Sequence, residues 1–167
     1  MKPFIAACIT FFLLSCGSVT KIYLVRHAEK ASSSTNPDLK DPEGFARANT
    51  LKDSMMGVHL NGVYSTNFLR TVHTAGPTAA AQNQTVKTYT DGDKLMDSLS
   101  QGKNKKYLVV GHSNTIPGMI RHFGLDPGFS GDIPDNDFDN LFIVIIKRRG
   151  HSFEKTIQIK TYGAASP

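Results

Sequence analysis

Cysteine and long apolar runs are both scarce in this chain of 167 residues. The cysteines are Cys8 and Cys16, and the apolar run from Phe4 to Leu14 is too short for a membrane-spanning helix, which needs ~20 residues. No stripe of aromatic and basic residues accompanies the net charge of +5, so we do not expect nucleic-acid binding. Internal repeats and linkers are also lacking, which argues against a repeat protein and against several domains.

The composition that remains is that of one globular domain. Hydrophobic residues make up 40% of the chain and charged residues 20%, which does not fit a disordered protein. A length of 167 residues is enough for one domain with a hydrophobic core and too short for two of ordinary size. The positive net charge would help to attract a small anionic substrate.

The first sixteen residues have the features of an export signal. Lys2 precedes the apolar run, and small residues follow the run at Ser15-Cys16-Gly17. The ending Leu13-Leu14-Ser15-Cys16 resembles a bacterial lipobox, which is cut before its cysteine. This resemblance implies that Cys16 carries lipid and anchors the protein to a membrane. A plain secretory signal with an incidental cysteine is the alternative.

We therefore expect three parts in the chain. Residues 1–15 would be a signal peptide, residues 16–20 a lipidated N-terminus with a short tether, and residues 21–167 the folded domain. Removal of the signal peptide would also remove Cys8, so no disulfide could form within one mature chain. The expected location is the periplasmic or cell-surface side of a membrane, and the oligomeric state is not predicted.

Short β-rich segments alternate with helical segments along the mature chain. Strands are expected at residues 21–26, 62–66, 85–89, 107–111, 141–147 and 156–161, with a turn at Gly150 between the last two. Helices are expected at residues 43–56 and at residues 68–82, the second with an interruption at Gly76-Pro77. A third helix is expected from a cap at Asp93 to before Gly102, and a fourth from a cap at Asn114 or Thr115 to His122. This alternation predicts an α/β fold, a three-layer sandwich with a mostly parallel central sheet flanked by helices.

Two arginines and two histidines stand at the ends of the predicted strands. Arg26-His27 closes the first strand, His112 follows the fourth, and Arg70 lies about one turn into the helix after the second. Ligands of such sheets bind beyond the carboxyl ends of the strands, where these side chains would meet. Guanidinium groups match phosphate oxygens, and a neutral imidazole is a competent nucleophile toward phosphorus. The residues therefore predict a phosphoryl-transfer site in which His27 attacks and Arg26 holds the oxygens.

Three sequence blocks carry a resemblance to a known family. "LVRHAEK", "YSTNFLRTVHTA" and "VVGHSNT" are similar, in order and over essentially the whole mature chain, to the signature blocks of the histidine phosphatase superfamily, also called phosphoglycerate mutase-like. The resemblance implies a phosphohistidine mechanism, with His27 as the nucleophile and Arg26, Arg70 and His112 completing the phosphate pocket. Water would then release phosphate. Such a mechanism needs no metal or other cofactor, and no metal-ligand spacing stands out in the sequence.

The resemblance is incomplete at the proton donor. Many members use a Glu between the second and third blocks, but residues 71–111 contain no Glu. Asp91, Asp93 or Glu29 could serve instead, or the chain could lack a donor. The same stretch lacks the insertion of the sugar-phosphate mutases, which favours a compact phosphatase. By size the chain resembles the small phosphohistidine phosphatases, and an open pocket would admit a phosphoprotein or a phosphorylated small molecule.

The missing Glu keeps a second interpretation open, a binding module of the same fold that holds a phosphorylated ligand without turnover. Among the other polar residues, His73 is expected to support the site or the core, and Ser113 and Asn114 to donate to phosphate or to cap the helix. The acidic run at residues 135–139 lacks the Gly and the terminal Glu of a calcium loop, so we expect a solvated turn there.

Overall fold

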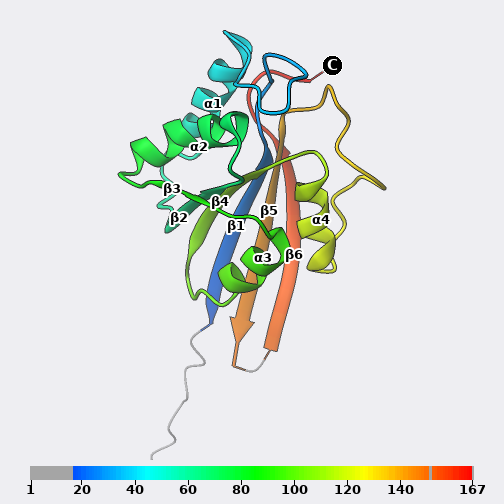
Figure 1. The fold of residues 1–167 in the computed structure, drawn as a ribbon. Coiled ribbons are helices and arrows are strands. Elements are labelled where there is room, and N and C mark those ends of the chain that lie inside the picture. The colour runs from blue at the N-terminus through cyan, green and yellow to red at the C-terminus, as the bar shows by residue number, and fades with distance from the viewer. Residues whose placement is uncertain (1–16, 151, 167) are drawn as a thin grey trace, which may run out of the picture.

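A six-stranded mixed sheet forms the centre of the protein in the computed structural model, which describes residues 17–150 and 152–166 (Figure 1). The strands are β1 (Ser18–Arg26), β2 (Gly62–Ser65), β3 (Val86–Thr88), β4 (Lys106–Gly111), β5 (Asn140–Arg149) and β6 (Ser152–Thr161). The helices are α1 (Glu43–Ser54), α2 (Leu69–Ala81), α3 (Gly92–Ser100) and α4 (Thr115–His122). The strand order is β3-β2-β4-β1-β5-β6, and the first four strands are parallel, while β5 runs antiparallel to both of its neighbours.

Helices cover both faces of the sheet because side chains alternate along its strands. On β1, Ile22 and Leu24 belong to the core under α3 and α4, whereas Tyr23 and Val25 belong to the core under α1 and α2. Each of these four side chains is at most 7% exposed. The predicted three-layer α/β sandwich is therefore confirmed.

The parallel half of the sheet brings three strand ends to one edge. Arg26 at the end of β1 is paired with Gly111 at the end of β4, and Ser65 of β2 is paired with Val110 of the same strand. The backbone N–H of His27 extends this pairing by donating to the carbonyl of Gly111 at 2.9 Å. The residues that follow β1, β2 and β4 are thus neighbours in space, as the sequence predicts.

Several boundaries differ from the sequence-based expectation. β1 begins at Ser18, which pairs with Arg148 of β5, so residues 18–20 belong to the sheet and are no tether. α2 continues through Pro77 without an interruption, although an interior proline removes one helical hydrogen bond and crowds the preceding turn. The turn expected at Gly150 is present, and its φ of 57° is a conformation that favours glycine.

The caps of α3 and α4 also differ. Asp91, and not Asp93, caps α3: its carboxylate accepts a hydrogen bond from the backbone N–H of Lys94 at 3.0 Å. The side chain of Asn114 makes no cap hydrogen bond, and Oγ1 of Thr115 instead accepts from the backbone N–H of His112 at 2.8 Å. A cap residue needs an extended backbone, which Asp91 has (φ −119°, ψ 107°) and Asn114 lacks (φ −88°, ψ −38°).

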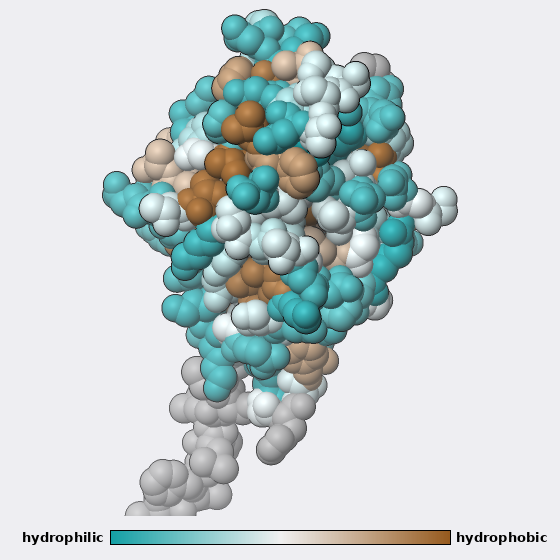
Figure 2. All heavy atoms as spheres, viewed as in Figure 1, coloured by the Kyte–Doolittle hydropathy of each residue, from teal (hydrophilic) through white to brown (hydrophobic). Residues whose placement is uncertain are grey.

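The expected signal peptide at residues 1–15 and the expected lipidation site at Cys16 lie outside the described residues. Within the described part of the chain, no helix is long and apolar enough to cross a lipid bilayer. The face of the molecule seen in Figure 2 is mainly hydrophilic, with separate groups of apolar residues among the polar ones.

Candidate active site

The rings of His27 and His112 lie beside each other at the carboxyl edge of the sheet, with their centroids 5.4 Å apart. Arg70 approaches from α2, and its Nη2 lies 3.4 Å from Nδ1 of His112. The guanidinium of Arg26 stacks on the ring of Phe138 at 4.2 Å, and that ring is centred 6.3 Å from His27. The structure therefore brings together all four side chains that the sequence proposed for the phosphate site.

The imidazole of His27 is held in one tautomer by the backbone. Its Nδ1 lies 2.7 Å from the carbonyl oxygen of Ala28, and because a carbonyl can only accept, Nδ1 carries the proton. Burial, together with the nearby charges of Arg26 and Arg70, lowers the pKa of His27 from 6.5 to about 3, although the bond to Ala28 opposes this shift. At neutral pH the ring is therefore uncharged, with a free electron pair on Nε2.

His112 has the opposite tautomer. A guanidinium can only donate, so Nδ1 of His112 accepts from Arg70 and Nε2 carries the proton. That Nε2–H donates to Oγ1 of Thr66 at 2.9 Å. Burial, and then the charges of Arg70 and Arg26, lower the pKa of His112 to about 4. His112 is therefore also uncharged at neutral pH.

Two threonines that the sequence analysis did not single out support this arrangement. Oγ1 of Thr66 lies 3.0 Å from Oγ1 of Thr71, which in turn donates to the carbonyl of Phe68 at 2.9 Å. Thr66 is 9% exposed and Thr71 is fully buried. The signal available in the sequence was weak, a hydroxyl residue at the last position of a predicted strand.

Thr74 joins the first and second sequence blocks. The backbone N–H of Ala28 donates to Oγ1 of Thr74 at 2.9 Å, and that hydroxyl donates to the carbonyl of Arg70 at 2.7 Å. Thr74 is fully buried. It thus fixes α2 against the residues that follow His27, a role that its place in a helical pattern did not reveal.

Arg26 is anchored by the loop before β5. The side chain is 3% exposed, and its Nη1 donates to the carbonyls of Pro134 at 2.7 Å and Asp137 at 2.9 Å. The predicted solvated turn at residues 135–139 is therefore wrong in part, since this loop supplies both a carbonyl and the ring of Phe138 to Arg26. The sequence does not reveal this contact, because a backbone carbonyl accepts the hydrogen bond from Arg26 and every residue has such a carbonyl.

Both arginines keep unused donors at the site. Nε of Arg26 and Nε of Arg70 are buried and have no hydrogen-bond partner. Arg70 otherwise reaches the carbonyl of Thr35 at 3.4 Å and lies over the ring of Phe68 at 4.6 Å. Buried unpaired donors are costly, and two charged ones next to neutral imidazoles suit an anionic ligand.

The three candidate proton donors are all held by cations. Glu29 accepts two hydrogen bonds from the guanidinium of Arg47, at 2.7 and 2.9 Å. Asp91 pairs with Lys94 at 3.2 Å, and its hydrogen bonds to that residue lower its pKa. Asp93 lies 3.7 Å from Nδ1 of His122. Each of the three carboxylates is therefore paired with a basic side chain that does not belong to the cluster of Arg26, His27, Arg70 and His112.

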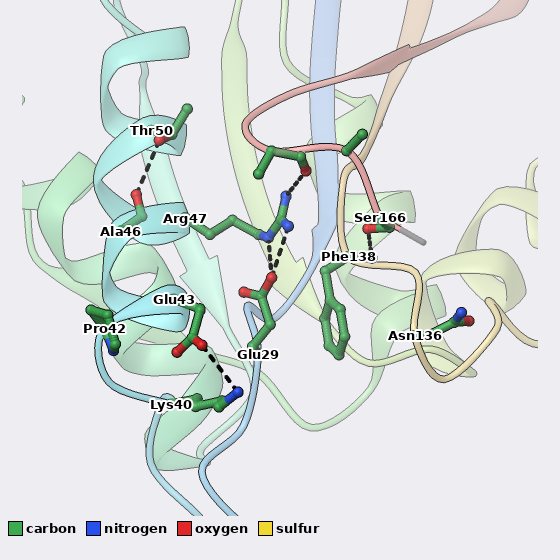
Figure 3. A pocket seen from close by; sticks show the side chains of 12 residues that line it. Glu29, Lys40, Pro42, Glu43, Ala46, Arg47, Thr50, Asn136, Phe138 and Ser166 are labelled. Carbon is green, nitrogen blue, oxygen red and sulfur yellow. Dashed lines mark hydrogen bonds and ion pairs between the residues drawn. The ribbon is translucent and has the colours of Figure 1, made fainter.

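A pocket of about 560 Å³ lies beside the cluster and shares Phe138 with it. Figure 3 shows its walls: α1 on one side, the segment of Ser166 on another, and Glu29 with Arg47 between them. Arg47 donates to the carbonyl of Ala164 at 3.0 Å, which fixes the C-terminal wall. The ion pairs leave little net charge in this pocket, and much of its lining is apolar (Pro42, Ala46, Phe138, Ala164, Ala165).

His73 is a partly exposed residue of α2. Its Nδ1 is 2.6 Å from a carboxylate oxygen of Asp38, and both side chains are 41% exposed, so His73 supports a loop and is not in the core. Ser113 and Asn114 lie directly before α4, and the side chain of Asn114 makes no cap hydrogen bond. Among residues 17–150 and 152–166, no group of three or more His, Cys, Asp or Glu side chains could hold a metal ion.

A comparison with protein families found a match to part of the chain. Residues 22–91 match the model of the histidine phosphatase superfamily (branch 1), a span that includes His27 and Arg70 and covers less than half of the chain. A comparison with curated proteins gave no match.

Solved structures resemble the whole fold at low identity. A protein from Nakamurella multipartitia that is assigned as phosphohistidine phosphatase SixA is 17% identical, covers 87% of this chain and 98% of its own, and has a TM-score of 0.59. Phosphoserine phosphatase from Entamoeba histolytica, with 3-phosphoglyceric acid, is 18% identical with the same coverage and a TM-score of 0.58. Mycobacterial hydrolase 2 is 11% identical, covers 90% of this chain and 93% of its own, and has a TM-score of 0.69. These solved structures share the fold of this chain, and the similarity to the histidine phosphatase superfamily (branch 1) is confined to residues 22–91.

Proposed function

We propose that this protein is a phosphatase that transfers a phosphoryl group to Nε2 of His27 and then to water. The hydrogen bond from Nδ1 of His27 to Ala28 carries the proposal. It leaves Nε2 as the unprotonated ring nitrogen, and the low pKa of the ring keeps it so at neutral pH. The substrate would be a phosphorylated small molecule or a phosphoprotein.

The first step forms a P–N bond at His27 and breaks the bond from phosphorus to the leaving group, which is a P–O bond in a phosphate ester and a P–N bond in phosphohistidine. Arg26 and Arg70 would bind the phosphoryl oxygens through their unused donors. Water then attacks the phosphohistidine, the P–N bond breaks, and phosphate leaves. Since little covalent chemistry falls to the protein in such a transfer, positioning and charge stabilisation supply most of the rate.

His112 would become a donor once a phosphate is bound. In the free protein its Nδ1 accepts from Arg70 and cannot donate. A bound dianion raises the pKa of a nearby imidazole, so Nδ1 would take up a proton and donate to a phosphate oxygen while Arg70 turns to the same group. This makes His112 a part of the catalytic site without a carboxylate partner.

The ion-paired carboxylates define which substrates this site would cleave. Because these carboxylates are engaged elsewhere, the leaving group would depart with little help from a general acid, whose contribution is typically ~10²–10⁴-fold. Aryl phosphates and phosphohistidine fit this requirement better than alkyl phosphates. The pocket of about 560 Å³ beside Phe138 offers space for the rest of the substrate.

The test is hydrolysis of p-nitrophenyl phosphate and glycerol phosphate by the wild-type protein and by His27→Ala, with chelator present. We expect the aryl ester to be cleaved faster, and the variant to be inactive while its circular dichroism spectrum is unchanged. Acid-labile labelling of the wild type by ³²P substrate, lost in the variant, would identify the phosphohistidine. Full activity of His27→Ala would contradict the mechanism.

A binding module is the second candidate, favoured by the same three ion-paired carboxylates. A folded wild type that binds tungstate, loses this binding in Arg70→Ala and cleaves neither ester would support the module over the enzyme.

For the location of the protein, we propose export and anchoring to a membrane through lipid on Cys16, as the lipobox-like ending predicts. Mass spectrometry of the mature N-terminus tests this, since an unmodified N-terminus at another residue would exclude it.

A further inference from the structure

Basic residues gather at the end of the sheet opposite the candidate active site. The surface, here called the basal surface, is made by the start of β1, the loop before β4 and the β5–β6 turn, shown at the bottom of Figure 1. Its cations are Lys21, Lys103, Lys105, Lys106, Lys147, Arg148, Arg149 and Lys155. These eight are drawn from 19 basic residues in the chain, whereas Glu154 is the one acidic residue of the same segments. The positive charge of this protein is therefore concentrated here.

Backbone pairing holds these segments together. Lys21 lies opposite Lys106, and its backbone N–H donates to the carbonyl of Lys105 at 2.9 Å. On the other side of β1, Val19 lies opposite Lys147. Arg148 ties β5 to the loop by donating to the carbonyl of Gly102 at 3.0 Å. The basal surface is thus a built part of the fold, whose cations cannot spread apart.

Apolar side chains are exposed among these cations. Val19 is 41% exposed and Phe153 is 45% exposed. The guanidinium of Arg148 lies 5.0 Å from the ring centroid of Phe153, and Nζ of Lys155 lies 5.5 Å from it. Figure 2 shows a mainly hydrophilic lower end with a small apolar area. Cations around an exposed aromatic ring suit the boundary between lipid headgroups and acyl chains, where both kinds of group are accommodated.

We propose that the basal surface binds the anionic headgroups of a phospholipid bilayer. The chain enters this surface at Gly17, directly after sixteen residues that contain the apolar run Phe4–Leu14 and no acidic residue. Clusters of four to eight Lys and Arg beside a membrane anchor bind anionic lipid. A basic surface beside a lipid anchor would add a second, electrostatic attachment to an anionic bilayer. The proposal does not depend on the phosphatase activity.

Binding through the basal surface would orient the protein on the bilayer and so limit which substrates reach the candidate active site. β1 runs from the basal surface to Arg26, and its nine residues at ~3.3 Å each separate the two ends by about 25–30 Å. The candidate active site would then open away from the bilayer. Its substrates would be soluble or carried on another molecule, and phosphates of the same bilayer would be out of reach.

The test is flotation of the full-length protein with vesicles of phosphatidylcholine, alone or with phosphatidylglycerol. The double variant Lys147→Glu/Arg149→Glu is compared with Lys87→Glu/Lys160→Glu, which has the same net charge and changes exposed cations elsewhere. We expect phosphatidylglycerol to strengthen binding, and the basal variant alone to lose that gain by about 10-fold or more. Equal losses in both variants, or no effect of phosphatidylglycerol, would overturn the proposal.

A second variant separates lipid from nucleic acid. Phe153→Ser should weaken binding to vesicles without changing the weak binding of duplex DNA that any basic surface shows. DNA binding as tight as vesicle binding, together with no effect of Phe153→Ser on vesicles, would assign the surface to nucleic acid and overturn the lipid assignment. Thermal unfolding of each variant identifies those that fail to fold. If Lys147→Glu/Arg149→Glu fails to fold, Lys105→Glu/Lys106→Glu takes its place.

Discussion

The Nε2–H of His112 donates to the hydroxyl of Thr66 across 2.9 Å, while Nδ1 of the same ring accepts from Arg70. The two residues come from different strand ends, after β2 and after β4. The contact therefore makes the phosphate site depend on the register of two parallel strands. It also predicts that a residue other than the two arginines and two histidines of the candidate site is needed for activity.

Thr66→Val should lower kcat/KM by about 10-fold, the worth of one hydrogen bond to a catalytic group, because it removes the acceptor for His112. Steady-state kinetics with p-nitrophenyl phosphate measure this change. Thr88→Val, on the exposed part of β3, is the matched control and should be neutral. An active Thr66→Val with an unchanged ¹⁵N spectrum of His112 would show that the tautomer is held by something else.

Arg70→Lys should lower kcat/KM by roughly 10–100-fold with little change in stability, since lysine keeps the charge and loses the planar fork. Nε of Arg70 is the unpartnered donor that lysine cannot replace. Arg149→Lys makes the same substitution at an exposed site and serves as the control. If both variants matched the wild type, Arg70 would have no place in phosphate binding.

Thr74→Val should destabilise the fold by about 1–3 kcal/mol, because the N–H of Ala28 loses its acceptor in a fully buried place. Thr74→Ser keeps the hydroxyl and should recover most of that loss. Urea unfolding of the three proteins gives the comparison. Equal stability of the Val and Ser variants would mean that the methyl group, and not the hydroxyl, is what matters.

Glu29→Gln should lower the free energy of unfolding and leave kcat within about threefold of the wild type, because the carboxylate of Glu29 is bound to Arg47. Arg47 is 6% exposed, so loss of its partner leaves a buried charge. Thermal unfolding and kinetics on one protein sample measure both effects. A large fall in kcat in a stable Glu29→Gln would restore Glu29 as the proton donor.

Stability should fall in mild acid because of the two site histidines. Their pKa values are about 3 and about 4 in the folded protein and ~6.5 when unfolded, so below pH ~6.5 the unfolded chain binds more protons. Between pH 7 and pH 5, His27 alone should cost roughly 2 kcal/mol of stability. His27→Gln should flatten the stability profile between pH 6.5 and pH 3.

His122 provides a contrast of opposite sign in the same measurement. Its hydrogen bond with Asp97 raises its pKa, so its contribution is present in acid and is lost as the pH rises through the folded pKa. His122→Gln should therefore steepen the loss of stability in acid. An unchanged profile in His27→Gln would show that His27 is protonated in the folded state near pH 6, against the mechanism proposed above.

The order of strands and helices, and the residues at the strand ends, could be predicted from the sequence. Apolar runs such as Tyr107–Gly111 are typical of buried parallel strands, and parallel strands bring their carboxyl ends to one edge. For that reason the convergence of Arg26, His27, Arg70 and His112 followed from local pattern and a general rule of sheet geometry. The errors were local as well: the cap at Asp91 instead of Asp93, and the start of β1 at Ser18.

The chemistry of the site was decided by the tertiary structure. The sequence alone determined that Arg26, His27 and His112 stand at strand ends, because local runs of residues form the strands. It could not determine that Arg26 is anchored by Pro134, 108 residues away, or that Glu29 is bound to Arg47. Such contacts join backbone carbonyls and side chains far apart in the chain, and they leave no periodic pattern. The state of each ionisable group depends on these contacts and on burial, which exist only once the sheet and its loops are assembled.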